Sequence, residues 1–189
     1  KRLFDKHGSV TGNAELENRF GLAIPFNVST SDFRKIPGCP VAYWVSDRVR
    51  ELYEQNPAIE DESPPKTGIS TGQNEKYILR WYEVDFMALG IGQPGRNAAH
   101  KYYPHNKGGE FKKWYGNQLD VLKYSDTDIA EMESEEGFRH DNAKLYFLPS
   151  ISWTKVTSSH FNARWYPTGF TFNSASVAIY PSNMEFMLG

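Results

Sequence analysis

Residues Leu145 to Phe172 read LYFLPSISWTKVTSSHFNARWYPTGFTF, and this stretch decides the predicted fold. Its β-branched and aromatic residues come in short runs, separated by proline, serine and glycine. Runs of this kind divided by turn residues are typical of consecutive β-strands. We therefore expect a β-meander with strands at 145–148, 151–156, 161–166 and 169–172, broken at Pro149, Ser158-Ser159 and Pro167-Thr168-Gly169.

Two segments upstream of the meander are predicted to be helical. Apolar residues from Val41 to Tyr53 recur at helical spacing, with Pro40 in the first turn and Asn56-Pro57 as the stop. A second helix is expected at 126–136, where Asp126 or Thr127 can cap the first turn.

The segment 77–86 (YILRWYEVDF) is predicted to be extended, because it is rich in aromatic and β-branched residues. A turn at Thr71-Gly72-Gln73-Asn74 leads into it, and the acidic, proline-broken stretch 60–65 before that turn is predicted to be a surface loop. The combined pattern indicates an α+β fold with a mixed, mainly antiparallel sheet and a few flanking helices. Three large rings are predicted to lie in the core: Trp81, Trp153 and Phe172.

Composition limits the class of protein. The chain has 189 residues, of which 39% are hydrophobic and 15% aromatic, as expected for one domain with an aromatic-rich core. The single cysteine, Cys39, cannot form an internal disulfide, which fits a reducing cytoplasm. No run approaches the roughly 18 apolar residues of a membrane span, and the N-terminus lacks a signal-peptide core. Since the chain does not begin with methionine, we expect a fragment of a longer cytoplasmic polypeptide.

The positive charge of the chain is concentrated between Lys101 and Asn117 (KYYPHNKGGEFKKWYGN). Four lysines face one glutamate there, a local charge of +3 in a chain of net charge −2. Lysines beside aromatic rings suit a nucleic acid, because ammonium groups bind phosphates and rings stack on bases. We expect this whole segment to lie at the surface and outside the core. The alternative is a solvated lysine loop with the rings tucked beneath it.

Other motifs do not assemble a predicted active site. Gly90-Ile91-Gly92-Gln93-Pro94-Gly95 matches a dinucleotide-binding pattern, but no apolar helix follows it, so a loop is expected. His100 and His105 lack a third ligand at metal-binding spacing. Ser63-Pro64-Pro65-Lys66 carries a lysine where an adenine methyltransferase has a base-stacking aromatic residue. The chain alone is thus predicted to hold no catalytic residue, no metal and no cofactor.

Several blocks resemble one family when they are taken together. They are Ile36 to Ser46, Gly68 to Asn74, Arg80 to Val84, Tyr103 to Asn117 and Ile151 to Lys155, followed by Arg164 and Pro167-Thr168-Gly169-Phe170. They resemble the C-terminal half of the large adenine-specific DNA methyltransferases of BREX phage-defence systems, the PglX type, and their type IIG relatives. In that family the cofactor motif and the Asn-Pro-Pro-Tyr motif lie upstream of these blocks, and neither occurs here.

The resemblance implies that residues 36–189 are a target-recognition domain, related to those of TaqI-like enzymes, and that 1–35 lead in from a preceding region. It also implies double-stranded DNA, the methyltransferase domain of the parent protein and other defence-system subunits as partners. S-adenosylmethionine would be a cofactor of the parent and not of this chain. The predicted DNA-binding residues are Thr71, Gln73, Asn74, Lys101, Asn106, Lys107, Lys112, Lys113, Trp114, Tyr115, Asn117 and Lys155.

Within that set, lysines would hold phosphates and amides would read bases, since Asn and Gln can pair bidentately with adenine. Asn106 and Asn117 adjoin glycines, so a role as turn residues is equally open. A rival function is a protein-interaction module that docks to other defence subunits through the acidic residues between Glu131 and Glu136. A lectin-like β domain is a weaker third possibility, suggested by the aromatic residues alone.

Overall fold

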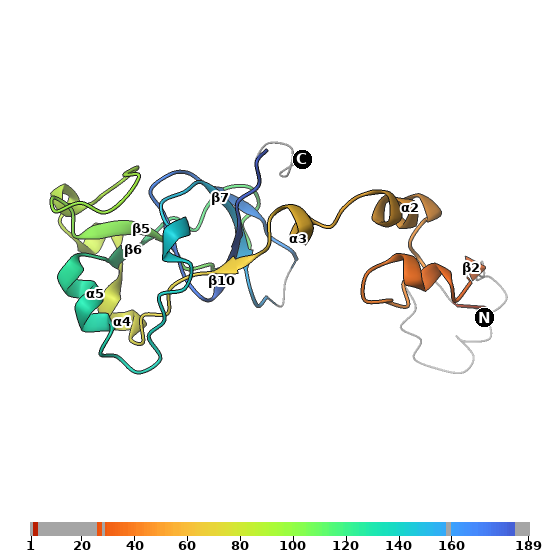
Figure 1. The fold of residues 1–189 in the computed structure, drawn as a ribbon, viewed down its shortest axis with the longest axis horizontal. Coiled ribbons are helices and arrows are strands. Elements are labelled where there is room, and N and C mark those ends of the chain that lie inside the picture. Colours follow the sequence, from red (N-terminus) through yellow and green to blue (C-terminus); the bar gives the residue numbers. More distant parts are fainter. Residues whose placement is uncertain (1, 4–25, 28, 158–159, 184–189) are drawn as a thin grey trace, which may run out of the picture. The chain divides into compact units, whose positions relative to one another are not determined.

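The predicted meander forms most of one antiparallel sheet in the computed structural model, which describes residues 2–3, 26–27, 29–157 and 160–183. Strand β7 (Ser150–Thr154) pairs with β8 (Arg164–Tyr166) and with β10 (Ser176–Ile179), and β10 also pairs with β3 (Lys66–Thr67). The order β3-β10-β7-β8 leaves β8 at one edge (Figure 1). The strands expected at 151–156 and 161–166 are therefore confirmed in shortened form, while the expected turn at Ser158-Ser159 lies outside the described residues.

A second sheet of four strands uses segments that are far apart in the sequence. Its order is β4 (Ile78–Arg80), β6 (Asp120–Lys123), β5 (Tyr102–Asn106) and β9 (Thr171–Phe172). The pairs β4–β6 and β5–β6 are antiparallel, and β5–β9 is parallel. The predicted class, α+β with mainly antiparallel strands, is confirmed. The last predicted strand, however, joins this sheet rather than the meander.

Two of the predicted extended segments differ from the structure: the strand at 145–148 is wrong, and the one at 77–86 is confirmed only in part. At 145–148 the structure has a short 3-10 helix, Ala143–Leu145, and Phe147 adopts a left-handed backbone conformation. Phe147 and Tyr146 bury their rings in the core while their backbones stay outside both sheets, so ring burial and strand pairing are separate here. Segment 77–86 is extended only in β4, because Glu83 accepts a hydrogen bond from the Arg80 N–H and closes a 3-10 turn over Trp81–Glu83.

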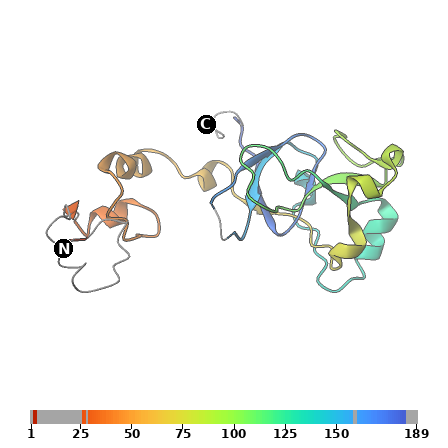
Figure 2. The same cartoon turned by 180° about the vertical axis from the view of Figure 1, so that it is seen from behind.

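Helices α4 (Asn74–Tyr77) and α5 (Asp126–Met132) lie side by side at one end of the second sheet (Figures 1 and 2). The predicted helix at 126–136 is confirmed, but it ends four residues early and its cap is Ser125, whose side chain accepts from the Asp128 N–H. Ile129 and Met132 of α5 are buried. They join a cluster formed by Ile69, Tyr77, Ile78, Tyr103, Leu122, Tyr124, Tyr146, Phe147, Phe172 and Ala178.

Core predictions held for one of the three large rings named above. Phe172 is buried as predicted, and Trp153 is only partly buried. Trp81 is 46% exposed, so the prediction that it lies in the core is wrong. The expectation that all of 101–117 lies at the surface is also wrong, because β5 is an inner strand between β6 and β9. Tyr103 and His105 of β5 are fully buried.

The chain divides into two compact units, Lys1–Glu62 and Ser63–Gly189, and the predicted boundary at 35–36 falls inside the first. In that unit the structure has β1 (Arg2–Leu3), β2 (Phe26–Asn27), η1 (Asp32–Lys35), α2 (Asp47–Gln55) and α3 (Ile59–Glu62). The helix predicted from Val41 begins at Asp47, because Ser46 caps it, and it ends before Asn56 as expected. Part of the predicted acidic loop is the single turn α3. No helix among the described residues is long and apolar enough to cross a membrane.

Candidate nucleic-acid interface

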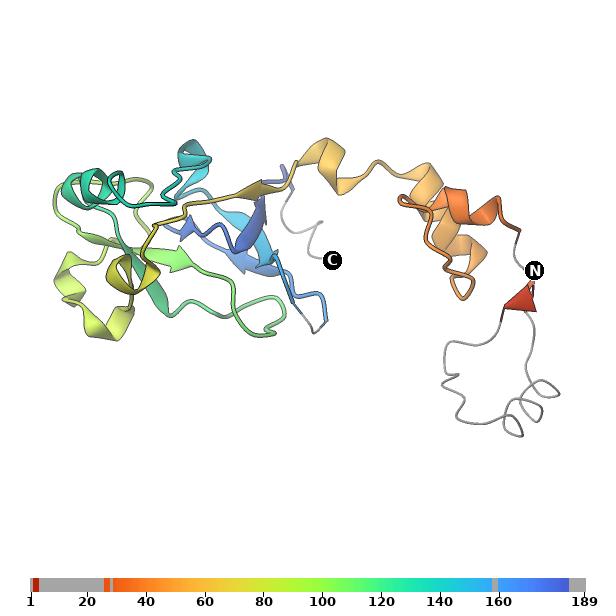
Figure 3. The same ribbon diagram turned by 90° about the horizontal axis from the view of Figure 1, so that it is seen from below.

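Residues 107–117, which we call the lysine loop, leave the second sheet after β5 and run to the edge of the first (Figures 2 and 3). The backbone of Trp114 bonds there to both neighbours of Arg164. Its N–H donates to the Ala163 carbonyl at 2.9 Å, and its carbonyl accepts from the Trp165 N–H at 2.9 Å. The Thr154 hydroxyl donates to the Gly109 carbonyl at 3.0 Å. The loop is therefore fixed to β7 and β8 rather than projecting freely.

The lysines of this region are exposed and form no ion pair with any described residue. Lys107, Lys112 and Lys113 belong to the loop, and Lys155 directly follows β7, where its N–H bonds to Ala175. In the part of the chain that the structure describes, none of these four ammonium groups lies within ion-pair distance of a carboxylate. Their charges are thus available to an anionic ligand.

Aromatic rings share this surface with the lysines. Trp114 is 48% and Tyr115 64% exposed, and the Lys113 ammonium lies 4.6 Å from the centre of the Trp114 ring. Phe111 contacts the ring of His160, with 6.1 Å between ring centres, and Phe161 contacts Trp153 at 5.7 Å. Trp114 holds a left-handed backbone conformation (φ 72°), which a tryptophan rarely adopts without support from its surroundings. Here the two backbone bonds to the edge of β8 supply that support.

A cleft of about 410 Å³ opens between the lysine loop and the start of β6. Arg80 and Asp120 form an ion pair of 3.2 Å in it, and the rest is lined by Lys107, Gly108, Gly109, Glu110, Asn117 and Leu119. Burial raises the pKa of Asp120, while the charges of Arg80 and Lys107 oppose that rise. The cleft therefore offers both donors and an acceptor to a polar ligand at the foot of the loop.

Two amides that were predicted either to read bases or to serve as turn residues form hydrogen bonds within and beside the loop. Asn106 is buried, with its Nδ2 donating to the Ser152 hydroxyl at 2.6 Å and its Oδ1 accepting from the Gly108 N–H at 3.0 Å. Asn117 has a left-handed backbone, and its Nδ2 donates to the Glu110 carbonyl at 2.8 Å. In this conformation both side chains bond to the backbone of the loop, as expected of turn residues.

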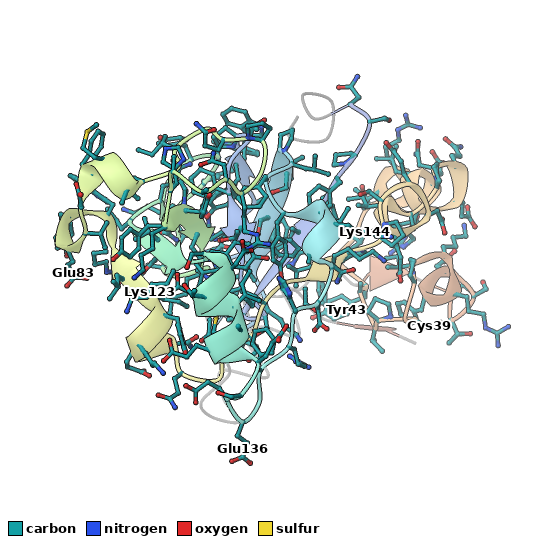
Figure 4. All side chains as sticks on the ribbon, turned by 60° about the vertical axis from the view of Figure 1, so that its left-hand side comes forward. Cys39, Tyr43, Glu83, Lys123, Glu136 and Lys144 are labelled. Carbon is teal, nitrogen blue, oxygen red and sulfur yellow. The ribbon has the colours of Figure 1, made fainter. Side chains whose placement is uncertain are left out.

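Four other predicted site residues lie at the opposite end of the second sheet. Thr71 is buried and donates to Asn74 Oδ1 at 2.9 Å, and Gln73 donates to Glu135 beyond α5. Lys101 precedes β5 and Lys107 follows it. At a rise of about 3.3 Å per residue, the two lysines are roughly 20 Å apart. Glu136 near this end points outward into solvent (Figure 4). The structure therefore brings together Lys107, Lys112, Lys113, Trp114, Tyr115, Asn117 and Lys155, but not Thr71, Gln73, Asn74 or Lys101.

Sequence reasoning missed Arg164 as a part of this region. It is fully buried beneath the loop, with its Nε 3.2 Å from the Tyr166 hydroxyl and its Nη2 3.4 Å from the Thr154 hydroxyl. Two signals were available, its place in the family-like stretch from Arg164 to Phe170 and its position beside strand-forming aromatic residues, but neither indicates a contact with the lysine loop.

The chain is related to adenine-specific methyltransferases over most of its length. It is 30% identical over 176 residues to the adenine-specific methyltransferase PglX of Lacticaseibacillus casei, which covers 86% of this chain. It is 32% identical over 163 residues to the adenine-specific methyltransferase BrxX of Escherichia coli, which covers 84%. The chain spans only 14% and 13% of the lengths of these two relatives. No family model matches it.

Proposed function

We propose that this chain recognises double-stranded DNA for an S-adenosylmethionine-dependent, adenine-specific DNA methyltransferase of a cytoplasmic phage-defence system. Its similarity to two adenine-specific methyltransferases supports the link to methylation. The observation that carries the DNA-binding part is the lysine loop, where unpaired ammonium groups and exposed rings share one anchored surface. In this proposal the rest of the parent protein binds the cofactor and performs the transfer.

The roles of the residues follow from their chemistry. Lys107, Lys112, Lys113 and Lys155 neutralise phosphates and set the position of the duplex, a contribution that does not depend on sequence. Trp114 and Tyr115 present ring faces that can stack on or wedge between bases. The cleft with Arg80 and Asp120 holds polar side chains beside the loop that can form hydrogen bonds to base edges.

A titration of the chain against a duplex at two salt concentrations tests the proposal. If three or four lysines contact phosphates, the slope of log affinity against log salt should be roughly −3 to −4, at about −0.9 per phosphate. Binding should be weak, because the chain as a whole carries a net charge of −2. An affinity that does not change with salt would contradict DNA binding through the loop.

The rival function is docking to another defence-system subunit through the acidic end, by which we mean the end of the second sheet that carries α4, α5 and the acidic residues from Glu131 to Glu136. Glu133 and Glu136 are exposed there and favour it. Against it, Lys76 pairs with Glu131 at 2.8 Å and with Glu135 at 3.0 Å, which leaves less free negative charge than the sequence suggests. An affinity for the duplex that does not change with salt would favour this second function.

A further inference from the structure

The lysine loop is held at both ends by hydroxyl groups that a single buried arginine contacts. Near its start, the Thr154 hydroxyl donates to the Gly109 carbonyl at 3.0 Å. Near its end, the Tyr166 hydroxyl donates to the Gly116 carbonyl at 3.4 Å. Arg164 lies between these hydroxyls and contacts both of them through different nitrogens.

The direction of each hydrogen bond in this cluster is fixed by the types of group. A guanidinium can only donate and a backbone carbonyl can only accept, while a hydroxyl does one of each with a single proton. Since Arg164 donates to both hydroxyls, each hydroxyl must accept from the arginine and direct its proton to the loop. Burial raises the pKa of Tyr166, so its phenol keeps the proton that it donates.

The middle of the loop is attached to the same strand. The backbone groups of Ala163 and Trp165 on either side of Arg164 bind Trp114. Loop residues 109, 114 and 116 are thus each tied to β7 or β8 within one cluster. Glycines at both ends, Gly109 and Gly116, have φ of +116° and +131°, so the loop ends rely on these contacts and not on their own conformational preference.

The charge of Arg164 indicates that the cluster is not there for stability alone. Its guanidinium is fully buried, and in the described chain neither a carboxylate pairs with it nor an acceptor reaches its Nη1. A buried charge without a partner costs stability, and an apolar side chain of similar volume is often at least as stable. What an apolar side chain cannot do is orient two hydroxyls toward the loop.

We infer that Arg164 is a positioning residue that presets the conformation of the lysine loop for DNA, by fixing the Thr154 and Tyr166 hydroxyls as donors to the two loop ends. The inference rests on the proposed function for its ligand. Arg164 itself makes no phosphate contact in this scheme. Its contribution is indirect, because a loop that is ordered before binding loses less conformational freedom when the duplex binds.

Hydrogen exchange and DNA binding together test this inference on Arg164→Met, Arg164→Lys and the milder Tyr166→Phe. In Arg164→Met and Tyr166→Phe, amide exchange across 109–117 should rise roughly fivefold to tenfold, as for the loss of one or two hydrogen bonds, with β5 and β6 unchanged. Affinity for all duplexes should fall by a similar factor. The salt slope should stay at its wild-type value, because the number of phosphate contacts is the same.

Arg164→Lys separates charge from orientation, since a lysine keeps the charge but cannot donate from a planar fork to two hydroxyls. We expect it to loosen the loop as the methionine does, and wild-type exchange in this variant would overturn the inference. So would unchanged loop exchange in Arg164→Met, or a loss of protection spread evenly over residues 63–183. If no form of the protein binds DNA, the proposed function fails, while the loop exchange still decides whether Arg164 orders the loop.

Discussion

Lys76 and the lysines of the loop lie at opposite ends of the second sheet and differ in their partners, although each end also holds an arginine–aspartate ion pair. At the end covered by α4 and α5, Lys76 pairs with Glu131 and Glu135, and Arg96 lies 2.6 Å from Asp126. At the other end, the lysine loop holds exposed ammonium groups without ion pairs in the described chain. Paired charges stabilise the local structure, whereas unpaired charges of one sign remain available to a ligand.

The two ends also differ in what orders them. The acidic end rests on the apolar cluster through Ile129, Met132 and Tyr77, and its ion pairs contribute little because solvent screens them. The lysine loop rests instead on buried polar groups, among them Arg164, Ser152 and Asn106. Buried polar networks specify one arrangement more than they stabilise it, which suits a surface that must be presented in a fixed form.

The largest expected effect comes from removing charge at the loop end. Lys112→Gln combined with Lys113→Gln should make the salt slope shallower by about 1.8, and at 0.1 M salt should lower affinity for every duplex on the order of fiftyfold. Sequence preference should not change, because phosphate contacts do not read bases. Binding titrations and genome-wide mapping of methylated sites in the parent protein measure the two effects.

The matched control for this pair is Lys123→Gln with Lys144→Gln. These lysines carry the same charge but lie outside the loop, Lys123 at the end of β6 and Lys144 within the 3-10 turn η4 (Ala143–Leu145) (Figure 4). Their replacement should change affinity only slightly. Equal losses in both double variants would mean that net charge, and not the loop, drives binding, and the contrast between the two ends would be lost.

Acid should weaken the β5 strand that joins the two ends before it weakens the ion pairs of the acidic end. Burial holds the pKa of His105 at about 3, and its Nδ1 lies 2.8 Å from the Thr171 hydroxyl. An unfolded histidine titrates near 6.5, so its contribution to stability is complete above that pH. It is lost as the pH falls toward about 3, at up to about 1.4 kcal/mol per pH unit.

The carboxylates of the acidic end act in a lower window. Hydrogen bonding to Lys76 lowers the pKa of Glu135, so its contribution is present above its ordinary value of 4.5 and lost only below it. Urea unfolding at pH 7, 6 and 5 should therefore show a loss that His105→Gln reduces. Burial also lowers the pKa of His140, which leaves a residual slope in that variant. An identical slope with and without His105 would contradict the assignment.

The sequence predicted the features that depend on neighbouring residues better than those that depend on contacts between distant segments. Local signals placed β7, β8 and α5 well, because strand propensity and capping act over a few neighbouring residues. Local reasoning could not show that β9 pairs in parallel with β5 and covers His105, since His105 and Thr171 are 66 residues apart. Nor could it show that Tyr103 is buried inside a basic segment, because its ring packs against the distant rings of Tyr124 and Phe147. The lysines and rings of the candidate site were predicted from local charge and aromatic content. The role that we infer for Arg164 could not be predicted in this way, because the contacts on which it rests form only when the fold brings Thr154 and Tyr166 to it.

The smallest expected effect is at the acidic end, where Asn74 was predicted to read a base. Its Oδ1 accepts from the buried Thr71 hydroxyl, and Lys76 of α4, the helix that Asn74 begins, pairs with Glu131 of α5 and with Glu135 just beyond it. A DNA phosphate would meet negative charge there. We therefore expect Asn74→Ala to cost about 1 kcal/mol of unfolding free energy through the lost hydrogen bond, and to leave discrimination between target and non-target duplexes unchanged. Thermal melts and competition binding with the two duplexes measure these effects. A selective loss of target binding at unchanged stability would place a base-reading residue at the acidic end, and both ends of the sheet would then have to face the DNA.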